Sequence, residues 1–314
     1  MPSIEAVDLT KKYGSFLALS NLNLKVEGPK CVGFLGPNGS GKTTALKMFT
    51  DLITPSSGQA LINGVDVHTQ KKQALTHASA LIETPEIYAS LTPREALTMI
   101  AEIRGVPKSE LRGRMEDVVA EVQMENWIDK RVGKLSKGMK QRICIASALL
   151  GNPTIIFLDE PTTGLDPRGM SEVRDIIKSL KGKDRLIFMS SHILSEVSDV
   201  CDEVALINRG RLIIYDTIGN VTAKFSGGKN VVEVGFSSSV DEKLANETIM
   251  GFPNVIETQR IDERNLRIKF TGGLGGQEAL LRKIVDLNVG VVSYKPASSG
   301  LEDAYLKLIA NTVW

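Results

Sequence analysis

A glycine-rich segment directly after a short apolar run constrains the fold of this chain most strongly. The apolar run, Cys31 to Leu35, predicts a buried strand, and the residues after the glycines predict a helix. The segment itself fits G-x-x-x-x-G-K-[ST] and consists of Gly36, Pro37, Asn38, Gly39, Ser40, Gly41, Lys42, Thr43 and Thr44. A strand that turns through glycines into a helix begins a βαβ unit, so a largely parallel sheet is expected.

The residue types in this loop suit a phosphate chain. Glycines let successive backbone N–H groups turn inward around oxygen atoms, and the start of a helix adds a positive dipole end. Lys42 supplies a charge for the outer phosphates, and Thr43 offers a hydroxyl to Mg²⁺. The pattern predicts a nucleoside triphosphate ligand but does not choose among kinases, motors and pumps.

Two adjacent acids follow a second apolar run, Ile155 to Leu158. Ligands of open α/β sheets lie at the carboxyl ends of the strands, where Asp159 and Glu160 stand. Asp159 is suited to hold Mg²⁺, directly or through water. Glu160 is suited to orient and deprotonate a water that attacks the γ-phosphate.

Composition limits the other possibilities. Lys plus Arg number 38 and Asp plus Glu 37, which gives no global charge to favour nucleic acid. No apolar run approaches the about 18 residues that cross a bilayer, and residues 1–8 lack a secretory pattern, so a cytosolic chain is expected. The separated cysteines, Cys31, Cys144 and Cys201, are expected to be reduced and buried.

The chain is expected to form two domains, residues 1–225 and 230–314, joined by a linker at 226–229. The first alternates strands with helices and contains a helical insertion at about 92–131, which opens on a capping box at Thr92 and Glu95. The second reads as strand 231–234, helix 241–250, hairpin 255–270, helix 277–287 and strand 289–293. That βαββαβ order is ferredoxin-like. A last helix is expected at 301–309, and no catalytic constellation is found after residue 230.

The segment Leu135 to Arg142 (Leu-Ser-Lys-Gly-Met-Lys-Gln-Arg), placed between the loop and the acids, resembles the signature of ABC ATPases. The resemblance covers residues 4 to about 220 and implies an α/β P-loop ATPase domain with a helical subdomain. In that family, Ser136 and Gly138 face the γ-phosphate of ATP held by the other subunit, so hydrolysis requires a dimer. Lys137 and Met139 depart from the usual Leu-Ser-Gly-Gly-Gln. Taken alone, Ser136 could equally be a plain helix N-cap.

Three further positions match the family. Tyr13 matches the aromatic residue that stacks on adenine, Asp166 the loop residue that contacts the partner subunit, and His192 the residue that contacts the γ-phosphate. Each has a plainer reading when taken alone. A tyrosine there is commonly a half-buried strand residue, and a lone histidine is commonly structural.

Glu83 stands where most family members carry glutamine. Its carboxylate can still serve Mg²⁺ or the attacking water, although it adds negative charge beside the phosphates. The Ile-Glu-x-Pro variant at residues 82–85 is similar to a branch of ABC ATPases that serves exporters of antibiotics and peptides. Residues 87–91 resemble the surface that receives a coupling helix from a membrane subunit.

The resemblance therefore implies an ATP-hydrolysing subunit that uses ATP and Mg²⁺ to drive transport through separate membrane-spanning subunits, and export is the expected direction. It implies a homodimer, or a pair with a related ATPase chain, bound peripherally at the cytoplasmic face of the membrane. A soluble ABC protein acting on ribosomes or DNA and a small-molecule phosphotransferase are the alternatives. The second domain could mediate dimer contact or regulation, or could be a stabilising appendage.

Overall fold

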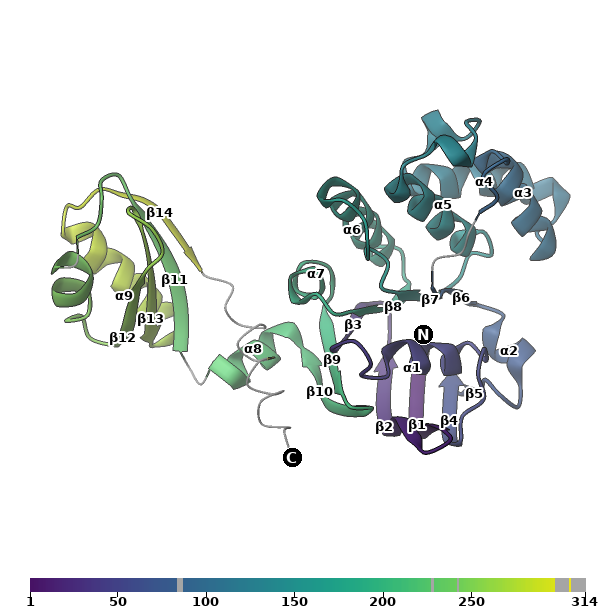
Figure 1. Cartoon of the computed structure of the whole chain (residues 1–314), viewed down its shortest axis with the longest axis horizontal. Helices are drawn as coiled ribbons and strands as arrows, with labels where there is room; N and C mark the ends of the chain where they lie inside the picture. Colours follow the sequence, from purple (N-terminus) through teal and green to yellow (C-terminus); the bar gives the residue numbers. More distant parts are fainter. Residues whose placement is uncertain (84–86, 227–228, 242, 297–304, 306–314) are drawn as a thin grey trace. The chain divides into compact units, whose positions relative to one another are not determined.

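A computed structural model describes residues 1–83, 87–226, 229–241, 243–296 and 305 of the chain. The chain divides into two compact units, Met1–Asp216 and Thr217–Trp314, and each is described by itself (Figure 1).

A six-stranded sheet forms the centre of the first unit, in the order β10-β9-β3-β8-β7-β6. Neighbouring strands from β9 to β6 pair in parallel wherever their register is defined, which confirms the predicted α/β class. β3 and β8 are buried along their whole length, as expected of strands covered on both faces. The strands are β3 (Cys31–Leu35), β6 (Ala78–Leu81), β7 (Ile155–Asp159), β8 (Leu186–Ser191), β9 (Glu203–Asn208) and β10 (Arg211–Thr217).

A second sheet, which the sequence did not lead us to expect, lies under the first. Its order is β2-β1-β4-β5, and its paired strands are antiparallel. The strands are β1 (Ser3–Tyr13), β2 (Phe16–Glu27), β4 (Ser57–Ile62) and β5 (Val65–Asp66). One core joins the two sheets around helix α1 (Lys42–Phe49), with aromatic rings in contact at Phe34, Phe49, Phe157 and Phe188.

Three helices follow strands of the six-stranded sheet or lead into it: α5 (Lys137–Leu149), α6 (Pro167–Lys181) and α7 (Leu194–Val200). Ser136 caps α5 by accepting from the Met139 N–H at 3.2 Å. Asp166 caps α6 by accepting from the Gly169 N–H at 3.1 Å, and Pro167 occupies its first turn. A short helix, α2 (Lys71–Leu75), lies beside β4 and β5.

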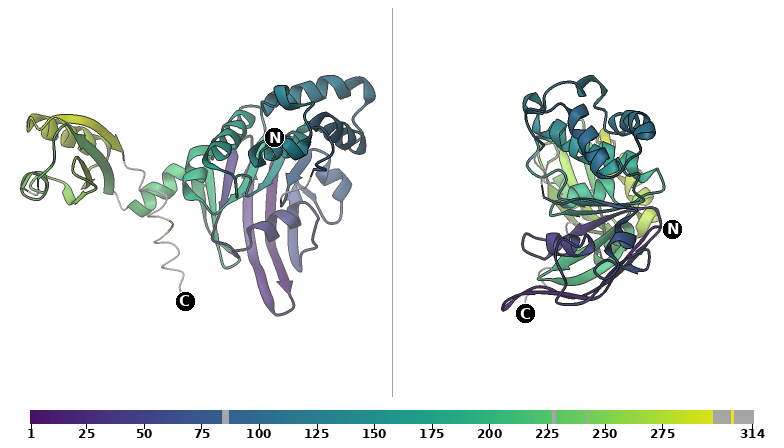
Figure 2. Two further views of the ribbon diagram at one scale, coloured as in Figure 1. Left: turned by 45° about the horizontal axis from the view of Figure 1, so that its top comes forward. Right: turned by 90° about the vertical axis from the view of Figure 1, so that its right-hand side faces the viewer.

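The helical insertion contains α3 (Pro93–Ile103) and α4 (Lys108–Glu121), followed by 3-10 turns at Glu125–Trp127 and Val132–Lys134. The predicted capping box is present, because Thr92 and Glu95 each accept from the other's backbone N–H. Figure 2 shows the insertion (blue to teal) set apart from the purple strands of the antiparallel sheet.

The second unit confirms the predicted ferredoxin-like order. Its sheet order is β12-β13-β11-β14, and all paired strands are antiparallel. The segment expected as an α-helix at 241–250 is a π-helix, η3 (Lys243–Ile249), and the helix expected at 277 begins four residues earlier. The elements are α8 (Ile218–Ser226), β11 (Lys229–Phe236), η3, β12 (Val255–Arg260), β13 (Asn265–Thr271), α9 (Gly273–Asp286) and β14 (Val291–Pro296).

The helix expected at 301–309 lies outside the described residues, apart from Tyr305. Over the described parts of the chain, no helix has both the length and the apolar character needed to cross a bilayer.

Candidate active site

The glycine-rich loop lies between β3 and α1 and curls around the Lys42 side chain. Lys42 Nζ donates to the backbone oxygens of Gly36 at 2.8 Å and Pro37 at 3.2 Å, and the side chain is only 5% exposed. Gly41 precedes the helix with φ +104°, and a Cβ there would lie 2.6 Å from the Ala18 oxygen. Only glycine fits this position, so the backbone, rather than a side chain, lines the loop.

The loop has an unmet hydrogen-bonding group. Ser40 is 2% exposed, and its Oγ has no hydrogen-bond partner in the described structure. A buried hydroxyl without a partner carries a cost unless a ligand oxygen satisfies it. The loop is therefore suited to receive the oxygens of a phosphate chain.

A pocket of about 360 Å³ adjoins the loop and reaches two exposed aromatic residues, Tyr13 and Phe16. Both flank the turn between β1 and β2, which brings them to the loop from a different sheet. Sequence reasoning found Tyr13 and missed Phe16, a residue that is 62% exposed. The lining residues are Tyr13, Phe16, Ala18, Asn38, Gly39, Gly41, Lys42, Thr43, Thr44 and Glu160.

Asp159 ends β7 next to the first turn of α1. Thr43 Oγ1 lies 2.9 Å from its Oδ2 and 3.2 Å from its Oδ1, and Ser190 Oγ donates to Oδ1 at 2.6 Å. The hydroxyl of Thr43 and the carboxylate are hard oxygen donors of the kind Mg²⁺ prefers. The donor set thus fits a magnesium ion beside the phosphate loop.

Glu160 is surrounded by groups that stabilise its negative charge. Lys42 Nζ lies 3.4 Å from Oε1, Thr163 Oγ1 donates to Oε2 at 3.0 Å, and His192 Nδ1 lies 3.1 Å from Oε2. Burial raises the pKa of this carboxyl, but the Thr163 hydrogen bond and the charges of Lys42 and His192 outweigh that effect, so the pKa is lowered. Glu160 is ionised at neutral pH and can accept a proton.

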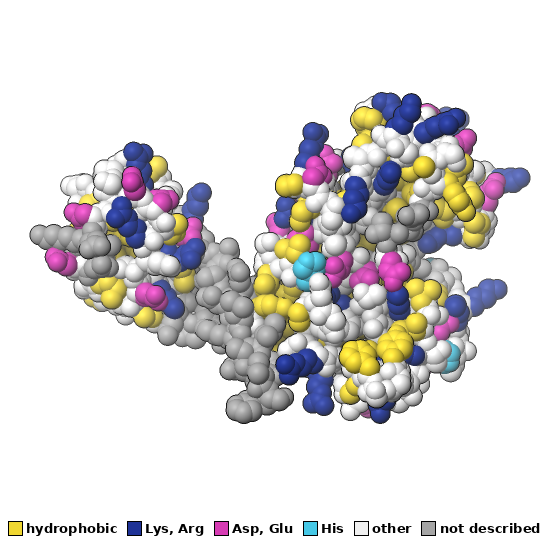
Figure 3. All heavy atoms as spheres, viewed as in Figure 1, with side chains coloured by type: hydrophobic (Ala, Val, Ile, Leu, Met, Phe, Trp, Pro, Cys, Tyr) yellow, Lys and Arg dark blue, Asp and Glu magenta, His cyan; other side chains and the backbone are white. Residues whose placement is uncertain are grey.

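His192 reaches Glu160 from the loop after β8, and a buried acid fixes that loop. Glu196 is 2% exposed and accepts from Thr162 Oγ1 at 2.5 Å and from Ser191 Oγ at 3.0 Å. It joins the segment after β7 to the segment after β8. Figure 3 shows acidic (magenta) and histidine (cyan) side chains gathered in the hollow between the helical insertion and the antiparallel sheet.

Glu83 follows β6, the neighbour of β7, and is 68% exposed. Its Oε1 lies 2.5 Å from Nζ of Lys47 on α1. The negative charge of Glu83, which the sequence analysis expected beside the phosphates, is therefore paired with the positive charge of Lys47, one helical turn beyond the loop. Sequence reasoning did not identify Lys47.

Ser136, Gly138 and Asp166 form a second cluster, in which Ser136 and Asp166 act as helix caps. The two helix starts touch at glycines, because a Cβ on Gly138 would lie 3.2 Å from the Gly169 Cα. No hydrogen bond or ion pair joins this cluster to Lys42 or Glu160 among the described residues. Within one chain, the site at the phosphate loop contains Lys42, Asp159 and Glu160. The second cluster presents a capped helix N-terminus.

A glycine-rich phosphate loop, paired acids on the adjacent strand and a helical insertion leading into a capped helix define an ATP-binding cassette. The comparisons agree: the family model described as "ABC transporter" matches residues 19–163. The chain belongs to the ABC transporter ATP-binding proteins, and as such it is an ATPase subunit that binds and hydrolyses ATP.

Individual relatives cover much or all of the chain. It is 37% identical to the bacitracin transport ATP-binding protein BcrA of Bacillus licheniformis, over 98% of this chain and 97% of the relative. It is 36% identical to the lantibiotic transport ATP-binding protein SrtF of Streptococcus pyogenes, over 70% of this chain and 94% of that one. A solved ATP-binding subunit of an ABC transporter superposes with a TM-score of 0.63 at 29% identity, covering 71% of this chain and 93% of the other.

Proposed function

We propose that two copies of this chain close around two Mg-ATP and drive the export of a peptide antibiotic through separate membrane-spanning subunits. The observation that carries the ATP-hydrolysis part of the proposal is the environment of Glu160. Its ionised carboxylate lies 3.4 Å from Lys42 Nζ and 3.1 Å from His192 Nδ1. These contacts support the role of Glu160 as the general base beside the phosphate loop.

Nucleotide binding uses the loop and the aromatic pair. Backbone N–H groups of residues 36–41 and the start of α1 surround the phosphates, and Lys42 releases the Gly36 and Pro37 oxygens to reach them. Ser40 Oγ gains a phosphate partner. Tyr13 stacks on adenine, and Thr44 completes the lining.

Thr43 and Asp159 would hold Mg²⁺, with Glu83 as a further oxygen donor. The ion, when bound, neutralises charge on the phosphates. Glu160 orients the attacking water and accepts its proton, and His192 supports Glu160 and contacts the γ-phosphate. Glu83 Oε1 is paired with Lys47, which leaves Oε2 as the oxygen it offers to the ion.

The second cluster completes the site of a second copy. Ser136 Oγ and the backbone of Gly138 stand at the positive end of α5 and suit the γ-phosphate bound by the partner chain. Asp166, at the start of α6, lies beside them through the Gly138–Gly169 contact and reaches the partner. A pair of this chain with a related ATPase chain would have the same geometry.

The transport role rests on the relatives and on the exposed surface of residues 87–91, just before the insertion. BcrA and SrtF are named for bacitracin and lantibiotic transport. Tyr88 is 69% exposed in the segment expected to receive a coupling helix. We therefore place the dimer at the cytoplasmic face of the membrane, bound to permease subunits.

Phosphate release from Mg-ATP by the purified chain, without any acceptor substrate, tests the enzymatic part. Wild type should release phosphate, and Lys42→Ala should lose nucleotide binding. A strict requirement for an acceptor would support a phosphotransferase instead. Co-purification of the tagged chain with integral membrane proteins from its own cells tests the transport part, and co-sedimentation with ribosomes in their place would contradict it.

A further inference from the structure

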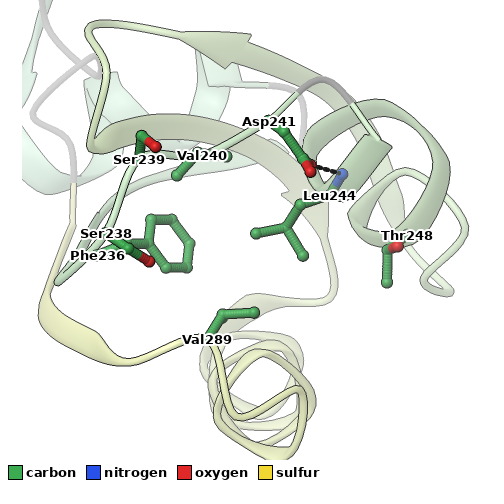
Figure 4. A pocket seen from close by; sticks show the side chains of 8 residues that line it. All are labelled: Phe236, Ser238, Ser239, Val240, Asp241, Leu244, Thr248 and Val289. Atoms are coloured by element: carbon green, nitrogen blue, oxygen red, sulfur yellow. Dashed lines mark hydrogen bonds between the residues drawn. The ribbon is translucent and has the colours of Figure 1, made fainter.

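The second unit contains a pocket that the ATPase mechanism does not use. Its volume is about 340 Å³, within the range of small-molecule sites. The floor is apolar and consists of Phe236, Val240, Leu244 and Val289, whose side chains point around a common space in Figure 4. All four belong to the hydrophobic core of this unit or pack against it, so the floor of the pocket is continuous with that core.

Backbone contacts hold the walls together. The Ser237 N–H donates to the Gly290 oxygen and the Val240 N–H to the Glu263 oxygen, both at 2.8 Å. Gly290 has φ +69°, a left-handed conformation that favours glycine, and a Cβ there would lie 2.1 Å from Ser237 Oγ. Leu244 and Thr248 come from η3, a π-helix, a rare conformation that is often found at functional sites.

The rim is polar and negatively charged. Ser238 and Ser239 contribute hydroxyls, and Asp241 contributes a carboxylate. Asp241 Oδ1 accepts from the Leu244 N–H at 2.7 Å, which fixes the carboxylate beside the floor (Figure 4). No lysine or arginine is among the described residues that line the pocket. A ligand that brings a positive charge therefore complements the rim.

We propose that this pocket binds a small amphipathic amine, with a compact aromatic or branched aliphatic group on the floor and its ammonium at Asp241. The ammonium donates to the Asp241 carboxylate, and the serine hydroxyls line another part of the rim. The pocket lies in a different unit from the phosphate loop, so this binding is independent of the nucleotide roles proposed above.

Methyl NMR of the full chain, labelled at Leu and Val, tests the proposal with 2-phenylethylamine and its neutral counterpart 2-phenylethanol. The amine should shift the methyls of Val240, Leu244 and Val289 saturably and should bind more tightly than the alcohol. Asp241→Asn keeps an oxygen for the Leu244 N–H and should weaken the amine by about tenfold, the effect of one charge-assisted hydrogen bond, without changing the alcohol.

The matched control is Glu278→Gln, which removes an exposed charge whose described partner is Arg282 in the same unit. It should leave binding of both probes unchanged. Three outcomes would overturn the proposal: no saturable shift of the floor methyls, equal affinity for amine and alcohol, or equal weakening by Glu278→Gln. Removal of residues 297–314 provides a further check, because methyl shifts from the deletion alone would assign the pocket to the chain's own end.

Discussion

The Ser190 hydroxyl holds both acids of the active site at once. Its Oγ donates to Asp159 Oδ1 at 2.6 Å and accepts from the Glu160 N–H at 2.9 Å, and the residue is fully buried. Ser190 faces Asp159 across the parallel pairing of β7 and β8. A buried hydroxyl between the two acids thus sets the geometry of the proposed magnesium ligand and of the proposed base.

Ser190→Ala should lower kcat by about 10- to 100-fold, the usual effect of removing a group that orients a metal ligand. The concentration of Mg²⁺ needed for half-maximal activity should rise. Steady-state ATPase assays over a magnesium titration measure both effects. Thr76→Ala serves as the control, because that hydroxyl donates to the Lys72 oxygen in an exposed helix end, and it should leave both quantities unchanged.

Thr163→Val should shift the pH dependence of ATP hydrolysis. The Thr163 hydrogen bond is the largest contribution that lowers the pKa of Glu160, so its loss raises that pKa. Glu160 acts as a base only above its pKa, and the acid limb of the kcat profile should therefore move to higher pH. Profiles of both proteins from pH 4 to 9 measure the shift. An unchanged acid limb would show that another group governs it.

Arg185→Met should destabilise the first unit. Arg185 precedes β8 and lies 2.8 Å from Glu121 on α4, and the two side chains are 6% and 11% exposed. Burial raises the pKa of Glu121, but its bonds to Arg185 and Lys183 outweigh that and lower it. Removing one partner of a buried pair costs about 3–5 kcal/mol, and the remaining Lys183 contact should keep the loss near the lower end.

The sign of the pH dependence follows from the lowered pKa of Glu121. The ion pair contributes stability above the ordinary glutamate pKa and loses it as pH falls through the lowered folded value. The difference between wild type and Arg185→Met should therefore be larger at pH 7 than at pH 4 in urea unfolding. Arg112→Met, which removes an arginine with a 91% exposed side chain paired with Glu116, should change stability by less than about 0.5 kcal/mol.

Gly138→Ala should impair turnover while preserving ATP binding to the single chain. Its Cβ would lie 3.2 Å from the Gly169 Cα, a backbone atom, so the starts of α5 and α6 must move apart. The phosphate loop lies elsewhere and should bind ATP normally. Gly113→Ala, in the exposed interior of α4 with no atom within 4 Å of its Cβ, is the control and should stabilise by about 0.5–1 kcal/mol. Equal turnover in the two variants would argue against the glycine contact.

Local patterns predicted much of this fold. The strand, glycines and helix around Lys42, the capping box at Thr92 and the βαββαβ order after residue 230 each depend on short-range physics. The antiparallel sheet was missed because the pairing of β1 with β2 and β4, and the separation of these strands from the parallel sheet, depend on long-range contacts. The exact helix type at 243–249 likewise depends on packing rather than on local propensity.

The site divides in the same way. Lys42, Asp159 and Glu160 follow from motifs, whereas Ser190 and Phe16 become neighbours of those residues only through strand register and a hairpin from another sheet. The register of a β7–β8 pair could have indicated Ser190, had the adjacency of those strands been assumed. The Lys47–Glu83 pair needed the structure, because it joins α1 to the end of β6.

The central claim is that one chain supplies Ser136 and Gly138 to the ATP bound by another. Sedimentation velocity of Glu160→Gln with and without Mg-ATP tests it most directly, because that variant should bind ATP without splitting it. We expect one chain in the absence of nucleotide and a two-chain species with Mg-ATP, which Gly138→Ala in the same background abolishes. A species that stays one chain with saturating Mg-ATP, together with full ATPase activity of the monomeric wild type, would rule out a site shared between two chains.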